Sequence, residues 1–228
     1  MPYSRSRKPP VLPSGNDLTS ALAGIGINLA VTPSPDADVE PTLVAGSIAG
    51  MEEGDLRVLA LVVTWFDLHS ARVNADRLIR LVATRGPRVR AFWAALARWK
   101  SKDRRFARLA GAYRRPRIDL LATGTAFQIS RRGEDPRFAG TCLRVPAGVL
   151  RDRPGDVQSA AALARRHRAY HWRVIIGPTY RADLWAALER TPTATPYALA
   201  AATGASYATA WTTRADLLLL DTASTNAA

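Results

Sequence analysis

"TPYALAAATGASYATAW", residues 195–211, is the stretch that decides how the C-terminal part of this chain is expected to fold. Two Ala-rich runs meet at Gly204, and glycine is the residue best able to adopt the left-handed backbone of a tight corner between helices. Thr195 is a good N-cap, and Pro196 suits the first helical position, where a missing N–H costs nothing. The sequence therefore predicts one helix that starts at Pro196 and another that starts near Ser206, itself a good N-cap.

A further helix is expected just before this stretch. It spans Asp183–Arg190, and its apolar residues at helical spacing are Leu184, Trp185 and Leu188. The helix after Gly204 is expected to run towards Leu220. Residues 181–220 thus form a three-helix unit, and a disordered tail is expected at residues 221–228.

The pattern of small residues in this unit resembles the helix-turn-helix of bacterial DNA-binding regulators. In that motif a small residue, usually Ala, sits in the second helix where the third helix crosses it. Ala200 matches this position, Leu199 matches the hydrophobic residue before it, and Gly204 matches the glycine four residues later. The resemblance implies a core placement for Ala205 and Ala210.

The resemblance also implies which residues of the last helix face outward, towards the major groove of DNA. These outward residues are Ser206, Tyr207, Ala208, Trp211, Thr212 and Ala215. Thr203 and Thr213 depart from the motif, which usually has aliphatic residues there, and no strand pair follows that could form a C-terminal wing. A weaker likeness, carried by no residue-level motif, links this combination of a helical domain, a small sheet and a helix-turn-helix to antitoxin or autoregulator proteins of abortive-infection systems.

The net charge of +13 is concentrated in the middle of the chain. Lys and Arg outnumber Asp and Glu by 22 to 6 in residues 85–180, against 7 to 9 before this segment and 3 to 4 after it. Such a block suits a polyanion such as nucleic acid, an acidic partner protein or an anionic membrane surface. A GC-rich genome explains why only three of the 32 basic residues are lysines, but it does not explain why they cluster.

An apolar stripe with a basic flank is expected near the start of this basic segment. The first apolar residues at helical spacing are Val89, Phe92, Trp93, Leu96 and Trp99, and the stripe continues from Phe106 after a possible break at "KSKD". The basic flank consists of Arg90, Arg98, Lys102, Arg105 and Arg108. A solvated helix face is the alternative reading. Twelve basic residues against two acidic ones between Arg85 and Leu120 favour a bound polyanion instead.

The rest of the chain predicts a mainly α fold with a small antiparallel β-sheet, an α+β class. Residues 1–41 are rich in Pro, Ser, Gly and Asp, which is typical of a disordered arm. Residues 42–180 are expected to form a helical domain that carries the Arg-rich face. Within it "RIDLLAT", "TAFQISR" and "TCLRVP" predict about three antiparallel strands between residues 117 and 150. A helical segment follows at residues 154–178. Its expected inward residues are Leu163, His167, Tyr170 and Val174, and its expected basic surface residues are Arg165, Arg166, Arg168 and Arg173.

No catalytic residue, metal site or cofactor is expected. His167 and His171 stand four apart, as ligands on one helical face do, but the adjacent glutamate and the downstream ligand of the zinc-hydrolase motif are missing from the sequence. Glu134 and Asp135 are adjacent in a turn and do not make a spaced acid/base pair. Cys142 is the only cysteine, so no intramolecular disulfide can form, and a small buried hydrophobe in a reducing cytoplasm is expected.

Membrane insertion and export are not expected. No run of residues approaches the roughly eighteen apolar residues that a membrane span needs. The basic N-terminus is followed by a short segment broken by Gly and Asn, whereas a secretory signal has a firmer apolar segment.

These features predict a cytoplasmic transcriptional regulator that binds double-stranded DNA. The helix after Gly204 would lie in the groove, and Arg214 would contact phosphates together with Arg98, Lys102, Arg105 and Arg108. This requires that the Arg-rich middle packs beside the three-helix unit and supplies the phosphate contacts. Otherwise the three helices have only a structural role. A homodimer is expected if the motif is that of a repressor, because paired half-sites demand a two-fold axis.

The alternative function is that of an antitoxin-like or adaptor protein. Its Arg-rich face would neutralise an acidic protein partner, and its interface anchors would be Trp93, Trp99 and Tyr113. RNA binding ranks third, because the sequence has no aromatic RNA-binding sheet motif.

Overall fold

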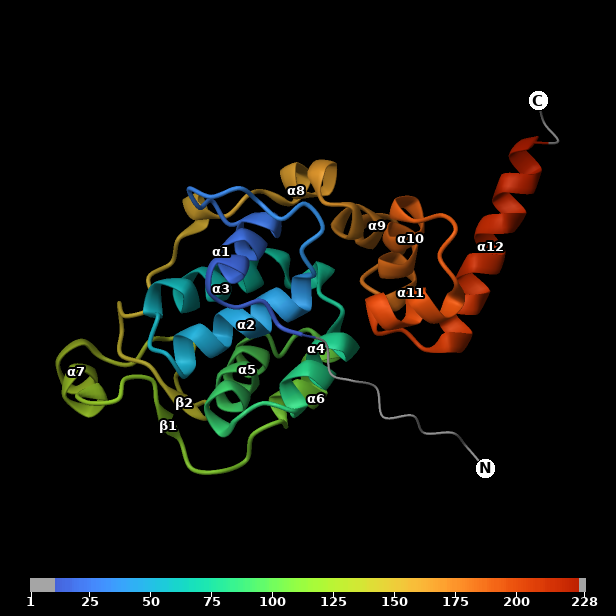
Figure 1. The fold of residues 1–228 in the computed structure, drawn as a ribbon. Helices are drawn as coiled ribbons and strands as arrows, with labels where there is room; N and C mark the ends of the chain where they lie inside the picture. The colour runs from blue at the N-terminus through green and yellow to red at the C-terminus, as the bar shows by residue number, and fades with distance from the viewer. Residues whose placement is uncertain (1–10, 226–228) are drawn as a thin grey trace. The chain divides into compact units, whose positions relative to one another are not determined.

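A computed structural model describes residues 11–225 of the chain, with side chains for residues 11–219. This part of the chain is mainly α-helical, with twelve α-helices, three short 3₁₀-helices and two strands of two residues each (Figure 1). It divides into two compact units. Unit 1 comprises the chain up to Ser70 together with Ala75–Gln158, and unit 2 comprises Ala71–Asn74 and the chain from Ser159 onward.

The elements of the two units follow in chain order. The helices of unit 1 are α1 (Gly15–Gly24), α2 (Val39–Met51), α3 (Leu56–His69), α4 (Ala75–Ala83), α5 (Pro87–Trp99), α6 (Ala107–Ala110) and α7 (Thr125–Arg132). The helices of unit 2 are α8 (Ala160–Arg166), α9 (Arg168–Ile176), α10 (Tyr180–Arg190), α11 (Pro196–Thr203) and α12 (Tyr207–Thr225). The strands are β1 (Ile118–Asp119) and β2 (Leu143–Arg144), and the 3₁₀-helices are η1 (Ser70–Arg72), η2 (Arg104–Phe106) and η3 (Pro154–Asp156).

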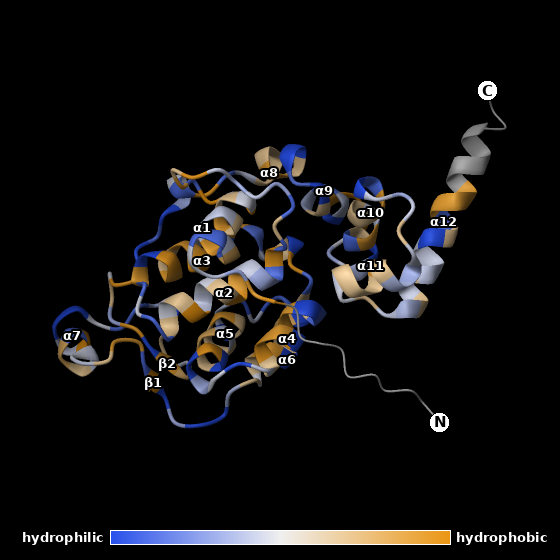
Figure 2. Cartoon of the chain, in the orientation of Figure 1, coloured by the Kyte–Doolittle hydropathy of each residue, from blue (hydrophilic) through white to orange (hydrophobic). Residues whose placement is uncertain are grey.

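Helix α2 is the central element of unit 1. It contacts α1, α3, α4 and α5, and every one of its residues except Ile48 is buried. A helix that buries residues around its whole circumference must be enclosed on all sides, and Figure 2 shows the apolar residues of the neighbouring α3 and α5 in orange. Gly46 and Gly50 allow α3 to approach closely, since a Cβ on Gly50 would lie 2.5 Å from the Leu59 Cβ.

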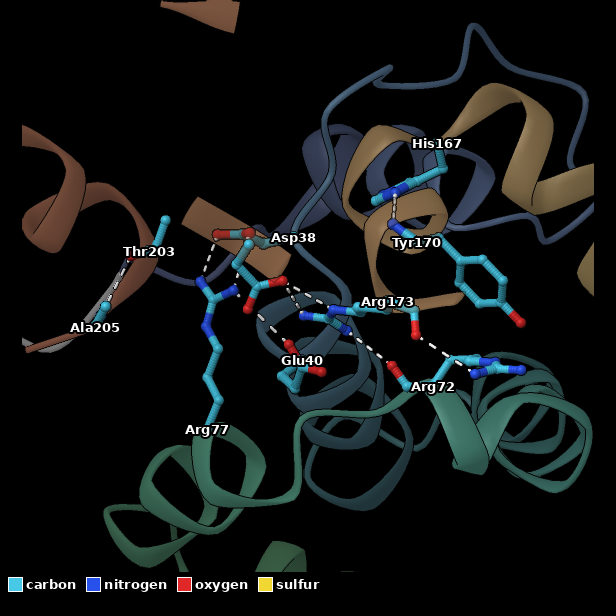
Figure 3. A network of polar contacts seen from close by, with 10 residues as sticks. Asp38, Glu40, Arg72, Arg77, His167, Tyr170, Arg173, Thr203 and Ala205 are labelled. Atoms are coloured by element: carbon cyan, nitrogen blue, oxygen red, sulfur yellow. Dashed lines mark hydrogen bonds and ion pairs between the residues drawn. The ribbon is translucent and has the colours of Figure 1, made fainter. Parts of the chain in front are cut away.

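Several polar groups in the core of unit 1 are paired. The Trp93 Nε1–H donates to the Ser47 hydroxyl (2.9 Å), and the Trp65 Nε1–H donates to the Ile25 carbonyl (2.8 Å). Arg77, almost completely buried, forms a two-bond contact with Asp38 at 2.7 and 3.1 Å and lies 3.7 Å from the buried Glu40 (Figure 3). Such charges are tolerated inside a protein because each has a partner of opposite sign.

The predicted antiparallel sheet is wrong. β1 and β2 pair in parallel, with Ile118 opposite Leu143, and "TAFQISR" forms helix α7 instead of a strand. Gly124 (φ 76°) precedes this helix and Gly133 (φ 80°) follows it. Because a helical segment connects the strands, the chain crosses over and returns in the same direction, as parallel pairing requires. Antiparallel pairing in the described residues is limited to two isolated bridges, so the fold class is mainly α.

The boundaries of the predicted domains also differ from those observed. The expected disordered arm contains α1 and the start of α2, because Leu18, Leu22 and Ile25 recur at helical spacing and are buried; residues 1–10 lie outside the described part. The division between the units falls after Gln158 and not after residue 180, since α8 contacts α9 and α9 packs on α10. The expected disordered tail is helical as far as Thr225, and residues 226–228 lie outside the described part.

Within residues 11–225, no helix combines the length and the apolar composition that crossing a membrane requires.

Candidate functional site

The turn between α11 and α12 has the geometry that the sequence predicts. Gly204 adopts a left-handed backbone with φ 75°, and its N–H donates to the Ala200 carbonyl (3.0 Å). The Thr195 hydroxyl accepts from the Ala198 N–H (3.2 Å), and the Ser206 hydroxyl accepts from the Thr209 N–H (3.0 Å). Both predicted N-caps and the corner are confirmed.

Small residues form the contact between these helices. The core of the three-helix unit consists of Leu184, Ala187, Leu188, Leu199, Ala200, Ala205 and Ala210. Ala205 and Ala210 are completely buried, so the placement that the motif implied for them is confirmed. Methyl groups in place of larger side chains let α11 and α12 approach closely, as the predicted crossing at Ala200 requires.

Thr203 and Thr213 occupy core positions although both carry a hydroxyl. They are 5% and 2% exposed, and each hydroxyl donates to a carbonyl four residues earlier, that of Leu199 or Thr209, at 2.8 Å. A buried hydroxyl that is bonded to its own helix leaves no unsatisfied group. The two departures from the motif are therefore compatible with its packing.

The outward side of α12 begins with two large aromatic side chains. Tyr207 and Trp211 are each 57% exposed, although most of the other residues of this helix segment are small. Ser206, Ala208 and Thr212 are also exposed, whereas Ala215 is half-buried. This surface offers aromatic rings, methyl groups and hydroxyls, and no side chain between Ser206 and Thr213 is charged.

Arginines near α12 are partly committed to contacts within unit 2. The Arg214 Nε–H donates to the Ala194 carbonyl (3.1 Å), so this predicted DNA-contacting residue supports the loop before α11. Arg181 pairs with Asp216 at 2.7 Å. The side chains of Arg165, Arg166, Arg168 and Arg190 are exposed. Unit 2 holds eight arginines against four acidic residues, so it carries a positive charge of its own.

Two arginines expected on the basic surface are bound to other parts of their own units. Arg173 is 1% exposed and pairs with the buried Asp183 in unit 2 (Nε to Oδ1, 2.8 Å). In unit 1 the guanidinium of Arg90 donates twice to the Ala112 carbonyl, at 3.0 and 2.7 Å. The Arg173 guanidinium thus binds a buried carboxylate and the Arg90 guanidinium binds a backbone carbonyl, so neither adds to an exposed cationic face.

The predicted basic flank lies on unit 1 but not on one continuous helix. α5 ends at Trp99, so Arg98 is on α5, Lys102 is in the turn after it, and Arg108 is on α6; all three are exposed. Arg105 is committed to Asp103 (Nε to Oδ1, 3.0 Å) and to the Ser70 carbonyl (3.1 Å). Its hydrogen bond lowers the pKa of the Asp103 carboxyl. Three of the four expected phosphate-contacting side chains are thus exposed and not bound to the backbone, although Arg108 lies 3.9 Å from the exposed Asp76 carboxylate, and Arg105 is structural.

The aromatic residues expected as anchors for a protein partner lie mainly inside unit 1. Trp93 is completely buried and Tyr113 is 6% exposed, with its hydroxyl donating to the Pro116 carbonyl (2.9 Å). Trp99 is half-buried, and the Lys100 Nζ lies 4.4 Å from the centroid of its ring. Trp93 and Tyr113 are core residues, so this anchor set is wrong.

His167 and His171 do not share a surface. The His167 Nδ1 accepts from the Tyr170 N–H (3.1 Å), which makes the buried His167 the N-cap of α9 (Figure 3), whereas His171 is exposed on the helix itself. No group of three or more His, Cys, Asp or Glu side chains that could hold a metal ion occurs among the described residues. The prediction that Val174 faces inward is also wrong, since this side chain is 42% exposed.

One surface feature escapes the sequence reasoning because residues 125–131 were expected to be a strand. On α7 a hollow of about 480 Å³ is lined by Gly124, Phe127, Gln128, Arg131 and Arg132. These positions are spaced three, one, three and one residues apart, which places them on one face of a helix. The same spacing in the sequence is the signal that would have predicted this face.

No family model, no curated protein and no solved structure matches this chain.

Proposed function

We propose that this chain is a cytoplasmic DNA-binding regulator whose helices α10–α12 act as a helix-turn-helix. The observation that carries the proposal is the outward face of α12. Tyr207 and Trp211 are more than half exposed there, one helical turn apart, just after the tight corner at Gly204. Large aromatic residues usually gain stability from burial, so two exposed ones on an otherwise small-residue surface favour a binding role.

The chemistry of this face suits base edges in the major groove. Alanine and threonine methyl groups contact the thymine methyl group, and serine and threonine hydroxyls can donate to or accept from bases. Small side chains also let a helix enter the groove deeply. Trp211, Thr212 and Ser206 are therefore proposed to contact bases, Thr212 through its methyl group because its hydroxyl donates to the Ala208 carbonyl (3.0 Å), with α11 supporting α12 from behind.

Phosphate contacts would come from exposed cations. In unit 2 these are Arg165, Arg166, Arg168 and Arg190, and in unit 1 they are Arg98, Lys102 and Arg108. Because phosphate contacts position a protein without reading sequence, their loss should weaken binding to all duplexes alike. Arg105 binds the Ser70 carbonyl and the Asp103 carboxylate, and Arg214 binds the Ala194 carbonyl, so these two arginines are proposed to support the fold.

The proposal includes binding as a homodimer, since helix-turn-helix proteins read two half-sites about one helical turn of DNA apart. Leu218 and Leu219 near the end of α12 are 49% and 68% exposed, beyond the residues that pack in the unit core, and Figure 2 shows this apolar segment in orange. A second copy could cover these leucines. Light scattering should give twice the monomer mass, and Leu218→Glu with Leu219→Glu should return the mass of one chain.

The experiment that tests the proposal is selection of bound duplexes from a random pool, followed by affinity measurements. Trp211→Ala and Thr212→Ala should bind the selected duplex about tenfold or more weakly, because each lost base contact is worth about 1–3 kcal/mol. Both should bind a scrambled duplex as the parent chain does. Tyr197→Ala is the matched control, because Tyr197 is an exposed aromatic residue on α11. Equal affinity of the parent chain for selected and scrambled duplexes would refute base readout.

A further inference from the structure

We infer that the hollow on α7 of unit 1 binds a nucleoside phosphate, with the base on Phe127 and the phosphate on Arg131 and Arg132. This site goes beyond the proposed DNA interface, which uses α12. The hollow measures about 480 Å³, within the range of about 300–1,000 Å³ that is usual for small-molecule sites.

The way α7 is held leaves this face accessible. Thr125 is 1% exposed, with its hydroxyl directed at the Leu121 carbonyl (3.4 Å), and Ile129, one turn later, is half-buried. Thr125 is the buried residue of this helix, so it marks the inward side of α7. Phe127, by contrast, is 64% exposed and lies on the face that lines the hollow. The helix thus presents its largest apolar side chain to solvent although its inward side is already occupied.

Positive charge beside this ring is not neutralised locally. Arg131 and Arg132 are exposed, and no carboxylate of residues 11–219 forms an ion pair with either. The two acidic residues that follow α7 are already paired, Glu134 with Arg117 and Asp135 with Arg137. The guanidinium carbon of Arg131 lies 5.7 Å from the Phe127 ring centroid, in the range of a cation–π contact. The hollow is therefore a site for an anion that also carries an apolar plane.

Each lining side chain has a role with such a ligand. An aromatic ring stacks on a nucleobase of any kind, a contact worth about 1–3 kcal/mol per base. The amide of Gln128 can both donate to and accept from a base edge. The planar guanidinium groups of Arg131 and Arg132 match the geometry of phosphate oxygens. An inorganic anion would use the arginines but leave the Phe127 ring exposed.

The test is isothermal titration of the full chain with AMP, adenosine, inorganic phosphate, thymidine monophosphate, a short oligothymidylate and a short acidic peptide. AMP should bind at least about tenfold more tightly than either adenosine or inorganic phosphate, because only AMP engages both the ring and the arginines. The oligothymidylate distinguishes the source of the nucleotide. Tighter binding than that of thymidine monophosphate indicates a single strand, and equal or weaker binding indicates a free nucleotide; either result supports the site.

Variants separate this site from general charge. Phe127→Ala, and Arg131→Gln with Arg132→Gln, should each weaken AMP binding by about tenfold or more. Phe127→Leu keeps an apolar side chain but has no ring, so it should weaken AMP binding by as much as Phe127→Ala does. This variant tests the site even if the alanine variant does not fold. The matched control is Arg114→Gln with Arg115→Gln, an exposed adjacent pair elsewhere on unit 1, which should bind AMP as the parent chain does.

The inference is overturned if phosphate binds as tightly as AMP, if Phe127→Leu binds AMP unchanged, or if the control pair loses as much affinity as the α7 pair. Preferential binding of an acidic peptide over AMP would also overturn it. Failure here is distinguishable from failure of the proposed DNA interface. Trp211→Ala should leave AMP binding unchanged, and Phe127→Ala should leave binding to the selected duplex unchanged.

Discussion

Cys142 shows how burial decides the chemistry of a single side chain in this protein. The thiol is 5% exposed, and its Sγ–H donates to the Ala91 carbonyl (3.3 Å). Burial raises the pKa of this thiol, because the thiolate loses the solvation that it has in water. The expectation of a small buried hydrophobe is confirmed.

Cys142 should consequently be unreactive in the folded protein. Ellman's reagent attacks the thiolate, so labelling at neutral pH should be at least about tenfold slower in the native chain than in urea. The absorbance of the released thiol follows the reaction directly. Labelling of the native chain at the denatured rate would show that unit 1 does not protect this side chain.

His69 makes the stability of unit 1 depend on pH. The ring is 1% exposed, packs on Trp65 and forms a 3.0 Å hydrogen bond between its Nε2 and the Gln158 carbonyl. Burial lowers the pKa of His69 from its ordinary 6.5, and the hydrogen bond opposes this in part. Below about pH 6.5 the unfolded chain binds a proton that the folded chain does not, so stability falls as the pH falls from there towards the folded pKa.

His69→Gln tests this effect, because an amide N–H can still donate to the Gln158 carbonyl but does not titrate. The free energy of unfolding, measured with urea at about pH 7.5 and about pH 5.5, should fall more in the parent chain than in this variant. Other titrating groups contribute equally to both chains and cancel in the comparison. An equal fall in both would show that His69 does not carry this part of the pH dependence.

At the scale of elements, the contact between α2 and α3 depends on the absence of side chains at two positions. A Cβ on Gly46 would lie 2.8 Å from the Val62 Cγ2, and a Cβ on Gly50 would lie 2.5 Å from the Leu59 Cβ. Real Cβ atoms do not approach so closely, so the helices would have to separate. α2 is enclosed on all sides, and such a shift would propagate to its other neighbours.

Gly50→Ala should therefore lower the free energy of unfolding by about 1–3 kcal/mol, the usual effect of overpacking a core. This holds although alanine is the better helix former. Gly155→Ala is the matched control, because a Cβ there would meet nothing within 4 Å and the backbone needs no positive φ. Urea unfolding of both variants measures the difference. A Gly50→Ala variant as stable as the control would contradict the tight contact.

At the scale of the whole molecule, the excess of basic residues predicts a strong dependence of DNA binding on salt. Each phosphate that the protein neutralises should add about −0.9 to the slope of log affinity against log salt concentration. Arg98 and Arg108 are exposed, as Arg105 is, but only the Arg105 guanidinium is bound to the Ser70 carbonyl. Their substitution tests whether unit 1 contributes to the proposed DNA interface.

Arg98→Gln with Arg108→Gln should make the slope less steep by up to about 1.8. The double variant should bind the selected and the scrambled duplex more weakly by the same factor. Arg57→Gln with Arg151→Gln removes the same charge at exposed positions outside the basic flank and should have a smaller effect. Affinities measured by fluorescence anisotropy from low to high salt give both slopes. Equal slopes for both double variants would assign the phosphate contacts to unit 2 alone.

The sequence by itself determined the features that short-range interactions control. The helix bounds near Gly204, the N-caps Thr195 and Ser206 and the buried Ala205 all depend on residues within a few positions of one another. N-caps and glycine corners act through backbone groups of the same turn, so the local pattern was sufficient. The excess of basic residues in the segment 85–180 likewise follows from the sequence alone.

Only the tertiary structure decided which of these basic residues remain on the surface and which way the strands pair. Arg173 is buried, and Arg90 and Arg105 are held at the surface of unit 1, because each guanidinium meets an oxygen from another segment of the chain. Because "TAFQISR" forms helix α7 and not a strand, β1 and β2 pair in parallel and not antiparallel. A pattern of seven residues is too short to distinguish a helix from a strand. Such choices depend on contacts between residues far apart in sequence, whose partners no local spacing identifies.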